Sequence, residues 1–152
     1  TSSRRSFCFL VSVNVNYTMD IRYFAGFFDG EGCISIVHTK GNNNYRLNVQ
    51  VSNTNKYVLM CFKKRFGGYV TPLIKRSDRH TQAYVWKLAD AKAGTFLKEI
   101  NPYLIVKKPQ GELALHFQNR INANRGNNTP LTDEERLHRK ELKEKLLAIK
   151  HS

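Results

Sequence analysis

Acidic residues are scarce over most of this sequence. Of the 12 Asp and Glu residues, five lie between positions 133 and 144, so residues 1–132 hold seven acids against 19 Lys and Arg. The stretch from Cys33 to Lys75 contains no acid at all. The net charge of +13 exceeds the magnitude of about 2–8 that suffices to keep a small domain soluble. A folded domain with this imbalance exposes a positive face, which predicts a polyanionic partner, most often nucleic acid.

Other absences exclude further classes of protein. No apolar run reaches the roughly 18 residues that a membrane span needs. The basic residues lie on predicted strands and not on an amphipathic basic helix, which disfavours a membrane-surface protein. The three cysteines are far apart, without a C-x-x-C pair or a zinc-type His spacing. They indicate reduced thiols, so we expect an intracellular protein that is not secreted.

The hydrophobic pattern predicts one α+β domain over residues 19–152, with its core at 20–118 and C-terminal helices to 152, after an extension of unknown role at 1–18. The predicted strands form two hairpins, at 33–39, 45–52, 69–75 and 82–88. The predicted helices lie at 20–29, 55–66 and 90–100, then after Pro109 and after a capping box at 132–135. This order, αββαββα plus two helices, predicts an antiparallel sheet with helices on one face and a basic face left open.

In the predicted strand at 45–52, apolar and polar residues alternate strictly, so Arg46, Asn48 and Gln50 point away from its apolar side. These residue types make paired hydrogen bonds to guanine and adenine edges in the major groove of DNA. A merely solvated face would mix both signs of charge, whereas this stretch has no acid. We therefore expect neighbouring strands and turns to extend one DNA-binding surface, formed by Ser35, Val37, Thr39, Asn44, Arg46, Asn48, Gln50, Thr71, Leu73, Lys75, Arg76, Arg79 and Lys87.

The first predicted helix ends in the sequence Phe24-Ala25-Gly26-Phe27-Phe28-Asp29-Gly30-Glu31-Gly32. A helix C-terminus presents carbonyl oxygens with partial negative charge, and Glu31 adds a carboxylate beside them. Such oxygens suit Mg²⁺, which takes few protein ligands and keeps water and phosphate oxygens. The alternative interpretation is a helix that ends in a glycine-rich turn with two solvated acids.

This segment resembles the LAGLIDADG motif of homing endonucleases, in the variant whose last acid is Glu. The resemblance includes both hairpins and Asn101-Pro102-Tyr103-Leu104 followed by Lys107-Lys108, and it covers about Asp20 to Gln118. It implies the homing-endonuclease fold and metal-dependent hydrolysis of both strands of a long, near-palindromic DNA site, leaving short 3′ overhangs. Because the chain holds a single motif, it implies a homodimer. The implied cofactor is Mg²⁺, with Mn²⁺ able to substitute and Ca²⁺ binding without supporting cleavage.

The resemblance also implies roles for individual residues. Glu31 matches the catalytic acid and metal ligand, and Gly30 matches the position whose carbonyl binds the metal. Lys107 matches a basic residue at the active-site periphery, while Asn53 stands where relatives often carry Gln and so departs from the pattern. The expected dimer interface is the motif helix, through Phe24, Ala25, Gly26, Phe28 and Asp29, the last of these mainly a cap at the helix end.

Two rival functions use the same fold. An RNA maturase would bind folded intron RNA, and a non-catalytic regulator would bind DNA without a metal site. The intact Glu31 argues against the regulator. An intron- or intein-type homing endonuclease is also expected to work in a prokaryotic cytoplasm or in an organelle that carries its own DNA.

Overall fold

The structure is a computed structural model that describes residues 19–126 and 130–152, so the predicted extension at 1–18 lies outside it. Within that part of the chain, no helix is both long enough and apolar enough to cross a membrane. The elements are α2 (Ile21–Glu31), β1 (Gly32–Thr39), β2 (Asn44–Asn53), α3 (Lys56–Phe66), β3 (Tyr69–Pro72), β4 (Tyr84–Ala89), α4 (Asp90–Ile100), the 3₁₀ helix η1 (Asn101–Tyr103), α5 (Lys108–Ala123) and α6 (Asp133–Lys150).

The four strands form one antiparallel sheet in the order β1-β2-β4-β3. The β1–β2 pairing runs from Gly32 opposite Val51 to Thr39 opposite Asn44. Strand β2 also pairs with β4, which joins the two hairpins into one sheet. Together with the helices, this sheet confirms the predicted α+β fold class. The alternation predicted along β2 is also confirmed, because Leu47, Val49 and Val51 are fully buried.

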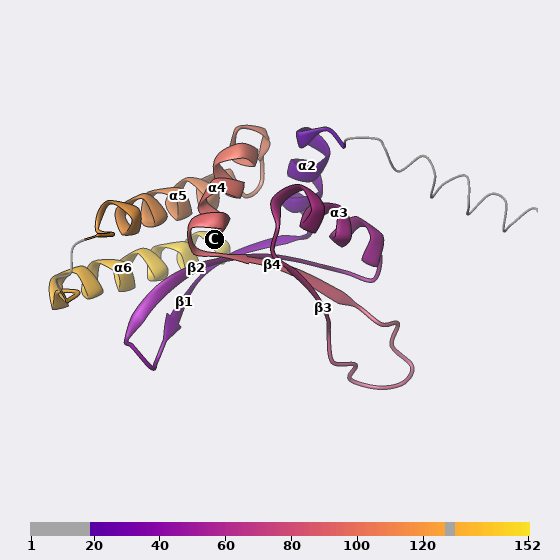
Figure 1. Ribbon diagram of the computed structural model, residues 1–152, viewed down its shortest axis with the longest axis horizontal. Coiled ribbons are helices and arrows are strands. Elements are labelled where there is room, and N and C mark those ends of the chain that lie inside the picture. Colours follow the sequence, from indigo (N-terminus) through magenta and orange to yellow (C-terminus); the bar gives the residue numbers. More distant parts are fainter. Residues whose placement is uncertain (1–18, 127–129) are drawn as a thin grey trace, which may run out of the picture.

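Helices α2 to α5 lie over one face of the sheet, and the β1–β2 turn and the β3–β4 connection project on the opposite side (Figure 1). The core between these layers is rich in aromatic rings. Trp86, Phe28, Phe62, Phe96 and Phe117 are all fully buried. Burying one such side chain contributes roughly 1.5–3 kcal/mol relative to leaving it exposed. The core therefore holds the helices to one face and leaves the other available.

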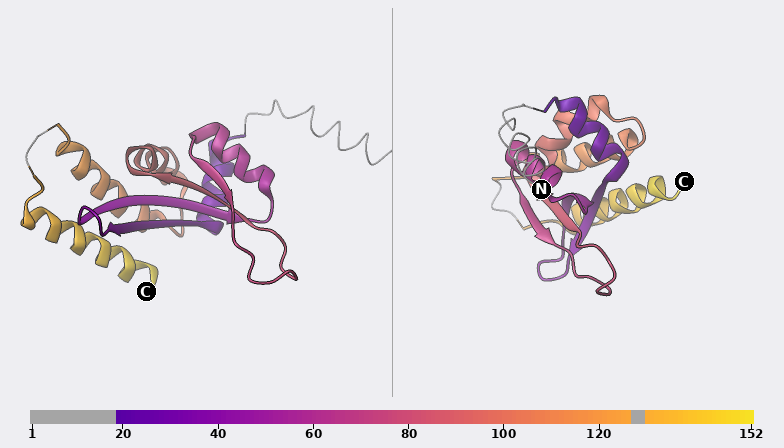
Figure 2. Two further views of the ribbon diagram at one scale, coloured as in Figure 1. Left: turned by 60° about the horizontal axis from the view of Figure 1, so that its bottom comes forward. Right: turned by 90° about the vertical axis from the view of Figure 1, so that its right-hand side faces the viewer.

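The second hairpin is shorter than predicted. Its strands are Tyr69–Pro72 and Tyr84–Ala89, whereas the sequence pattern predicted strands at 69–75 and 82–88. Proline has no N–H to donate to a strand ladder, and β3 ends at Pro72. One further backbone bond, Leu73 N–H to the Ala83 carbonyl at 2.8 Å, follows it. The residues between form an irregular connection that extends away from the sheet (Figure 2).

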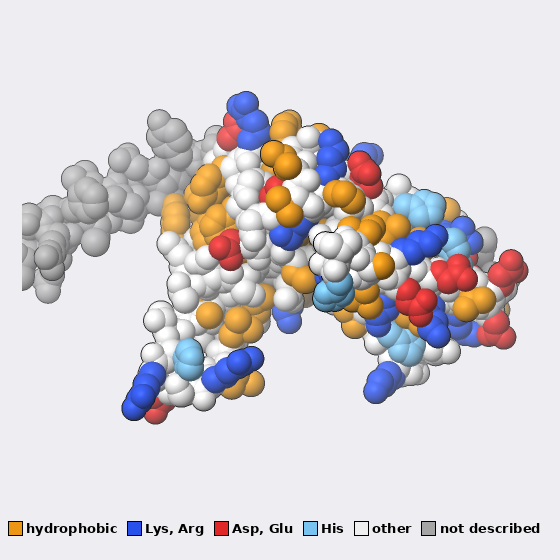
Figure 3. Space-filling view, turned by 180° about the vertical axis from the view of Figure 1, so that it is seen from behind, with side chains coloured by type: hydrophobic (Ala, Val, Ile, Leu, Met, Phe, Trp, Pro, Cys, Tyr) orange, Lys and Arg blue, Asp and Glu red, His pale blue; other side chains and the backbone are white. Residues whose placement is uncertain are grey.

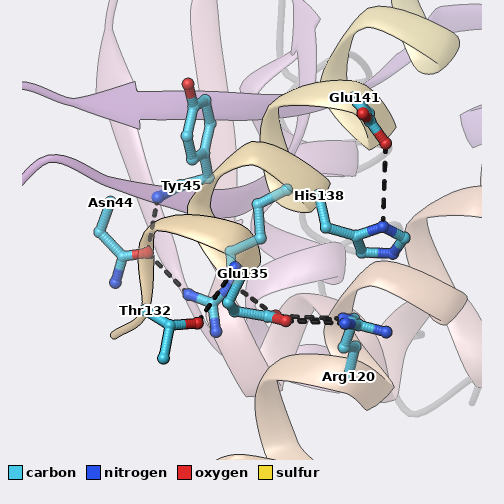
Figure 4. Close-up of polar contacts among 8 residues, drawn as sticks. Asn44, Tyr45, Arg120, Thr132, Glu135, His138 and Glu141 are labelled. Atoms are coloured by element: carbon cyan, nitrogen blue, oxygen red, sulfur yellow. Dashed lines mark hydrogen bonds and ion pairs between the residues drawn. The ribbon is translucent and has the colours of Figure 1, made fainter. Parts of the chain in front are cut away.

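Helix α6 packs beside α5 and β1, and it adds Leu142 and Leu146 to the core. Its N-terminus forms half of the predicted capping box, because the Thr132 hydroxyl accepts from the Glu135 N–H at 3.2 Å. The Glu135 carboxylate does not complete the box and instead binds two arginines, Arg120 and Arg139 (Figure 4).

Arg139 is nearly fully buried and reaches from α6 to the tip of the first hairpin. It donates to Glu135 at 3.1 Å and to the Asn44 side-chain oxygen at 2.7 Å. Burial raises the pKa of the Glu135 carboxyl, but hydrogen bonds from Arg120 and Arg139 outweigh burial and hold the pKa below its ordinary value of 4.5. This network ties α5, α6 and the β1–β2 hairpin together.

Candidate nucleic-acid interface and active site

The sheet face away from α2 to α5 forms a hollow between two projections (Figure 3). Lys and Arg side chains gather at the tip of the projection formed by the β3–β4 connection. Helices α2 to α5 lie on the opposite side of the sheet and therefore do not cover this hollow (Figure 1). A hollow flanked by positive charge in this way attracts a polyanion.

The strand register brings most of the predicted DNA-binding residues onto this face. Opposite one another lie Ser35 and Asn48, then Val37 and Arg46. In the pairing of β2 with its other neighbour, β4, Gln50 lies opposite Lys87. Thr71 of β3 shares this side through its pairing with Val85.

Four predicted contacts are not on strands. Leu73, Lys75, Arg76 and Arg79 lie in the β3–β4 connection and are exposed there. Asn44 is on β2, but its side-chain oxygen accepts from the Tyr45 N–H at 2.8 Å and from Arg139. One acceptor of that side chain is therefore engaged within the subunit.

The structure adds three residues that the sequence pattern did not single out. A pocket of about 450 Å³ opens where β4 turns into α4, and its lining includes Tyr69, Asp90 and Lys92 together with Arg46 and Lys87. The Tyr69 side chain is 75% exposed on the same face. The period-two alternation of the second hairpin could have indicated Tyr69, but Asp90 looked like an ordinary first-turn acid of a helix.

Helix α2 carries the acid of the motif at its end. The helix runs to Glu31, two residues further than predicted, and the break falls at Gly32. A side chain at Gly32 would overlap the Phe28 ring and its carbonyl oxygen. Glu31 is exposed, and within residues 19–126 and 130–152 it has no hydrogen-bond or ion-pair partner. Its carboxylate oxygens are therefore available to an external ligand.

Asp29 fixes the loop that follows η1. Its carboxylate accepts from the backbone N–H groups of Ile105 at 3.1 Å, Val106 at 3.0 Å and Lys107 at 2.8 Å. Burial raises the pKa of this carboxyl, but the three backbone donors outweigh burial and hold the pKa below its ordinary value of 3.8. The Lys107 ammonium group donates to the Asp29 carbonyl at 2.5 Å. The loop thus brings Lys107 to the last turn of α2, where its partner Asp29 shortly precedes Glu31 in the sequence.

Asn53 lies at the same end of the sheet. It is two residues beyond Val51, which pairs with Gly32 at the start of β1. Its side-chain oxygen accepts from the Asn55 N–H at 2.8 Å, in the turn that begins α3. The structure therefore brings Glu31, Lys107 and Asn53 to one end of the sheet, and it uses one polar atom of Asn53 locally.

The two faces of α2 differ in burial. Phe24, Ala25 and Phe28 are at most 2% exposed and belong to the subunit's own core, and the Asp29 carboxylate is engaged by the loop at 105–107. Helical spacing places these apolar side chains on the stripe that packs inward. The opposite stripe consists of Tyr23, Gly26, Phe27 and Gly30. A side chain added at Gly26 or Gly30 would meet nothing within 4 Å.

A hollow flanked by basic side chains, with an exposed carboxylate at the end of α2, is the arrangement expected of a nucleic-acid-binding protein with a hydrolytic site. A family model described as LAGLIDADG endonuclease matches residues 24–119. The chain therefore belongs to the LAGLIDADG endonuclease family, and its fold is that of the homing endonucleases. A search of curated proteins found no match.

Solved structures of homing endonucleases share this fold. The homing endonuclease I-CvuI in complex with its DNA target is 24% identical, with a TM-score of 0.66 over 85% of this chain and 80% of that one. I-CvuI on another target, in the presence of Mg, is 25% identical with the same TM-score and coverage. The archaeal intron-encoded I-Vdi141I, complexed with DNA, is 19% identical with a TM-score of 0.66, over 85% of this chain and 82% of that one.

Proposed function

We propose that the chain is a site-specific endonuclease that cuts both strands of a double-stranded DNA target as a homodimer. The observation that carries the proposal is the exposed Glu31 carboxylate at the end of α2, next to a sheet whose open face bears Arg46, Asn48, Gln50 and Lys87. Membership of an endonuclease family and the DNA complexes of I-CvuI and I-Vdi141I support it. Phosphate contacts would position the duplex, and base-edge contacts from the sheet would select the sequence.

The oxygen donors at the end of α2 fit a divalent cation of the Mg²⁺ type. The described residues contain no group of three or more His, Cys, Asp and Glu that could hold a metal alone. Mg²⁺ needs few protein ligands, because it keeps water and takes phosphate oxygens. The Glu31 carboxylate and the Gly30 carbonyl would hold it against the DNA, with Mn²⁺ able to substitute. The I-CvuI complexes with Ca and with Mg support the use of divalent ions.

The bound cation would supply an activated water and charge stabilisation for the leaving 3′ oxygen. The chain's own residues orient this chemistry. Glu31 would hold the cation at the helix end, and Lys107, whose ammonium group donates to the Asp29 carbonyl, would place a positive charge beside the cleaved phosphate. Among the described residues only the side-chain oxygen of Asn53 is engaged, so its amide N–H₂ would remain available to orient a water molecule.

Two copies of Glu31 are needed because the two DNA strands run in opposite directions. The outer stripe of α2, with exposed Tyr23, Gly26 and Gly30 and half-buried Phe27, offers a close helix contact about a two-fold axis. Ile105 and Val106 of the loop that Asp29 binds are 83% and 70% exposed, and they would add apolar area to such a contact. A symmetric pair predicts a near-palindromic site and short 3′ overhangs.

The family also suggests the biological setting. We propose that the protein acts on the uninterrupted form of a gene that hosts its own intron or intein. That activity would take place where such genes are found, in a prokaryotic cytoplasm or in an organelle with its own DNA.

The decisive test is cleavage of that uninterrupted gene in vitro, with Mg²⁺ and with EDTA. We expect double-strand cleavage at one site with Mg²⁺ and none with EDTA. Glu31→Gln should bind the same DNA with similar or higher affinity, because a negative charge near phosphate is removed, and should not cut it. Cleavage by Glu31→Gln at the normal rate would refute the assignment. Binding of intron RNA without DNA binding would favour a maturase instead.

A further inference from the structure

Arg46 and Asp90 form an ion pair on the open face of the sheet. The Arg46 Nε donates to both carboxylate oxygens of Asp90 at 3.1 Å, and Nη2 also donates to Oδ2. Among the residues that line the pocket at the β4–α4 junction, Asp90 is the single acid beside Arg46, Lys87 and Lys92. An acid on a surface that attracts DNA phosphates weakens that attraction, so its presence there needs a reason.

The backbone at Asp90 is itself unusual. The residue has φ of +56° at the start of α4, in the left-handed region that L-residues rarely adopt. Asp and Asn are the non-glycine residues that tolerate this region best. The conformation turns the chain from β4 into α4, and the carboxylate meets a guanidinium that lies 44 residues earlier in the chain. Backbone strain held in place by a specific contact is frequent at functional positions.

The ion pair leaves one edge of the guanidinium unused. Asp90 occupies the edge formed by Nε and Nη2, and within the described residues Nη1 has no partner. The Arg46 side chain is 48% exposed, and the free edge consists of Nη1 and the second N–H of Nη2. These two parallel donors match the O6 and N7 acceptors of a guanine in the major groove.

We propose that Asp90 is a specificity-determining positioning residue, which holds the Arg46 guanidinium rigid so that its free edge reads one guanine in each half-site. An arginine without such an ion pair would lose side-chain freedom on binding and would reach phosphates as easily as bases. The carboxylate lowers that cost and repels the phosphates, so it favours the base contact over the backbone contact. This inference rests on the proposed binding of double-stranded DNA.

The test begins with selection of bound duplexes from a random double-stranded DNA library by the unmodified protein. The selected site should contain a G·C pair at two symmetric positions where Arg46→Ala removes the preference. Affinities are then measured for the selected site and for the same site with that pair changed to A·T. We expect the unmodified protein to discriminate by about tenfold or more at this pair.

Asp90→Asn keeps the shape and tolerates the positive φ, and Asp90→Gly accepts the backbone freely if the first variant folds poorly. Both should lose most of the discrimination at this one pair while their affinity for unrelated DNA stays equal or rises. In an Arg46→Ala background, the same Asp90 changes should have no effect on discrimination. Asp78→Asn, which removes an exposed acid from the β3–β4 connection, is the charge-matched control and should preserve the discrimination.

The inference is overturned if both Asp90 variants discriminate as well as the unmodified protein. It is also overturned if their loss persists without Arg46, or if Arg46→Ala weakens all sequences equally, since Arg46 would then be a phosphate contact. If the unmodified protein enriches no sequence, the proposed function itself fails and the inference fails with it.

Discussion

The three backbone hydrogen bonds to Asp29 can be tested by the substitution Asp29→Asn. The variant keeps the shape of the side chain but replaces one carboxylate oxygen with an N–H₂ group, which donates and cannot accept. Oδ2 accepts from two backbone N–H groups and Oδ1 accepts from one. The best orientation of an amide therefore saves the two bonds to Ile105 and Val106 and leaves the Lys107 N–H facing another donor.

The expected cost follows from that count. Leaving one partly buried N–H unsatisfied costs about 1–3 kcal/mol, and solvent access to this loop favours the lower half of the range. For a chain of this length, a loss of about 1–2 kcal/mol lowers the melting temperature by about 2–8 °C. The pKa of Asp29 lies below 3.8 in the folded protein. Its stabilising contribution is therefore complete above that pH and disappears as the pH falls through the folded pKa.

Urea unfolding of both proteins at a series of pH values between 7 and 3 measures this effect. The unmodified protein should be the more stable one at pH 7, and the difference between the two should shrink below about pH 4. Asp78→Asn serves as the control, because it removes an exposed carboxylate and should leave the unfolding midpoint close to unchanged. Equal stability of Asp29→Asn and the unmodified protein at pH 7 would refute the reasoning, as would a deficit that is independent of pH.

Three further outcomes are expected. Gly26→Leu should give a folded protein by circular dichroism that sediments as a monomer and no longer cuts both strands, because the added side chain meets open space in the subunit; an unfolded chain, or an intact dimer, would contradict this. Arg139→Met should lower the free energy of unfolding by about 1–3 kcal/mol, since Asn44 and Glu135 each lose a donor, whereas exposed Arg22→Met should change the melting temperature little. Replacing Mg²⁺ with Ca²⁺ should preserve DNA binding in a gel-shift assay and stop cleavage, so efficient cutting with Ca²⁺ would be evidence against the proposed site.

Local sequence patterns predicted most of the fold. Alternation identified β2 and its polar side. The helix predicted at 90–100, before Pro102, coincides with α4, Asp90–Ile100. The pattern also placed the acid of the motif at the end of α2. These features depend on neighbouring residues in the chain, which is why periodicity and capping are sufficient to find them.

The features that sequence analysis missed depend on contacts between distant residues. The carboxylate of Asp29 binds a loop 76 to 78 residues later, and Arg46 pairs with an acid 44 residues away. Local periodicity contains no record of such pairs. Helical periodicity also did not separate the two sides of α2. Phe24, Ala25 and Phe28 form the apolar stripe that packs into the subunit's own core, and the opposite stripe is the side left for a partner.

The sheet order also has a consequence for solubility. In the order β1-β2-β4-β3, the edge strands are β1 and β3. An exposed edge strand pairs readily with other chains and so promotes aggregation. Helix α6 lies beside β1, and β3 is only four residues long and ends in proline. Both edges are poor templates for an incoming strand, so the wide polar face of the sheet can stay open for a ligand without making the subunits prone to assemble into larger sheets.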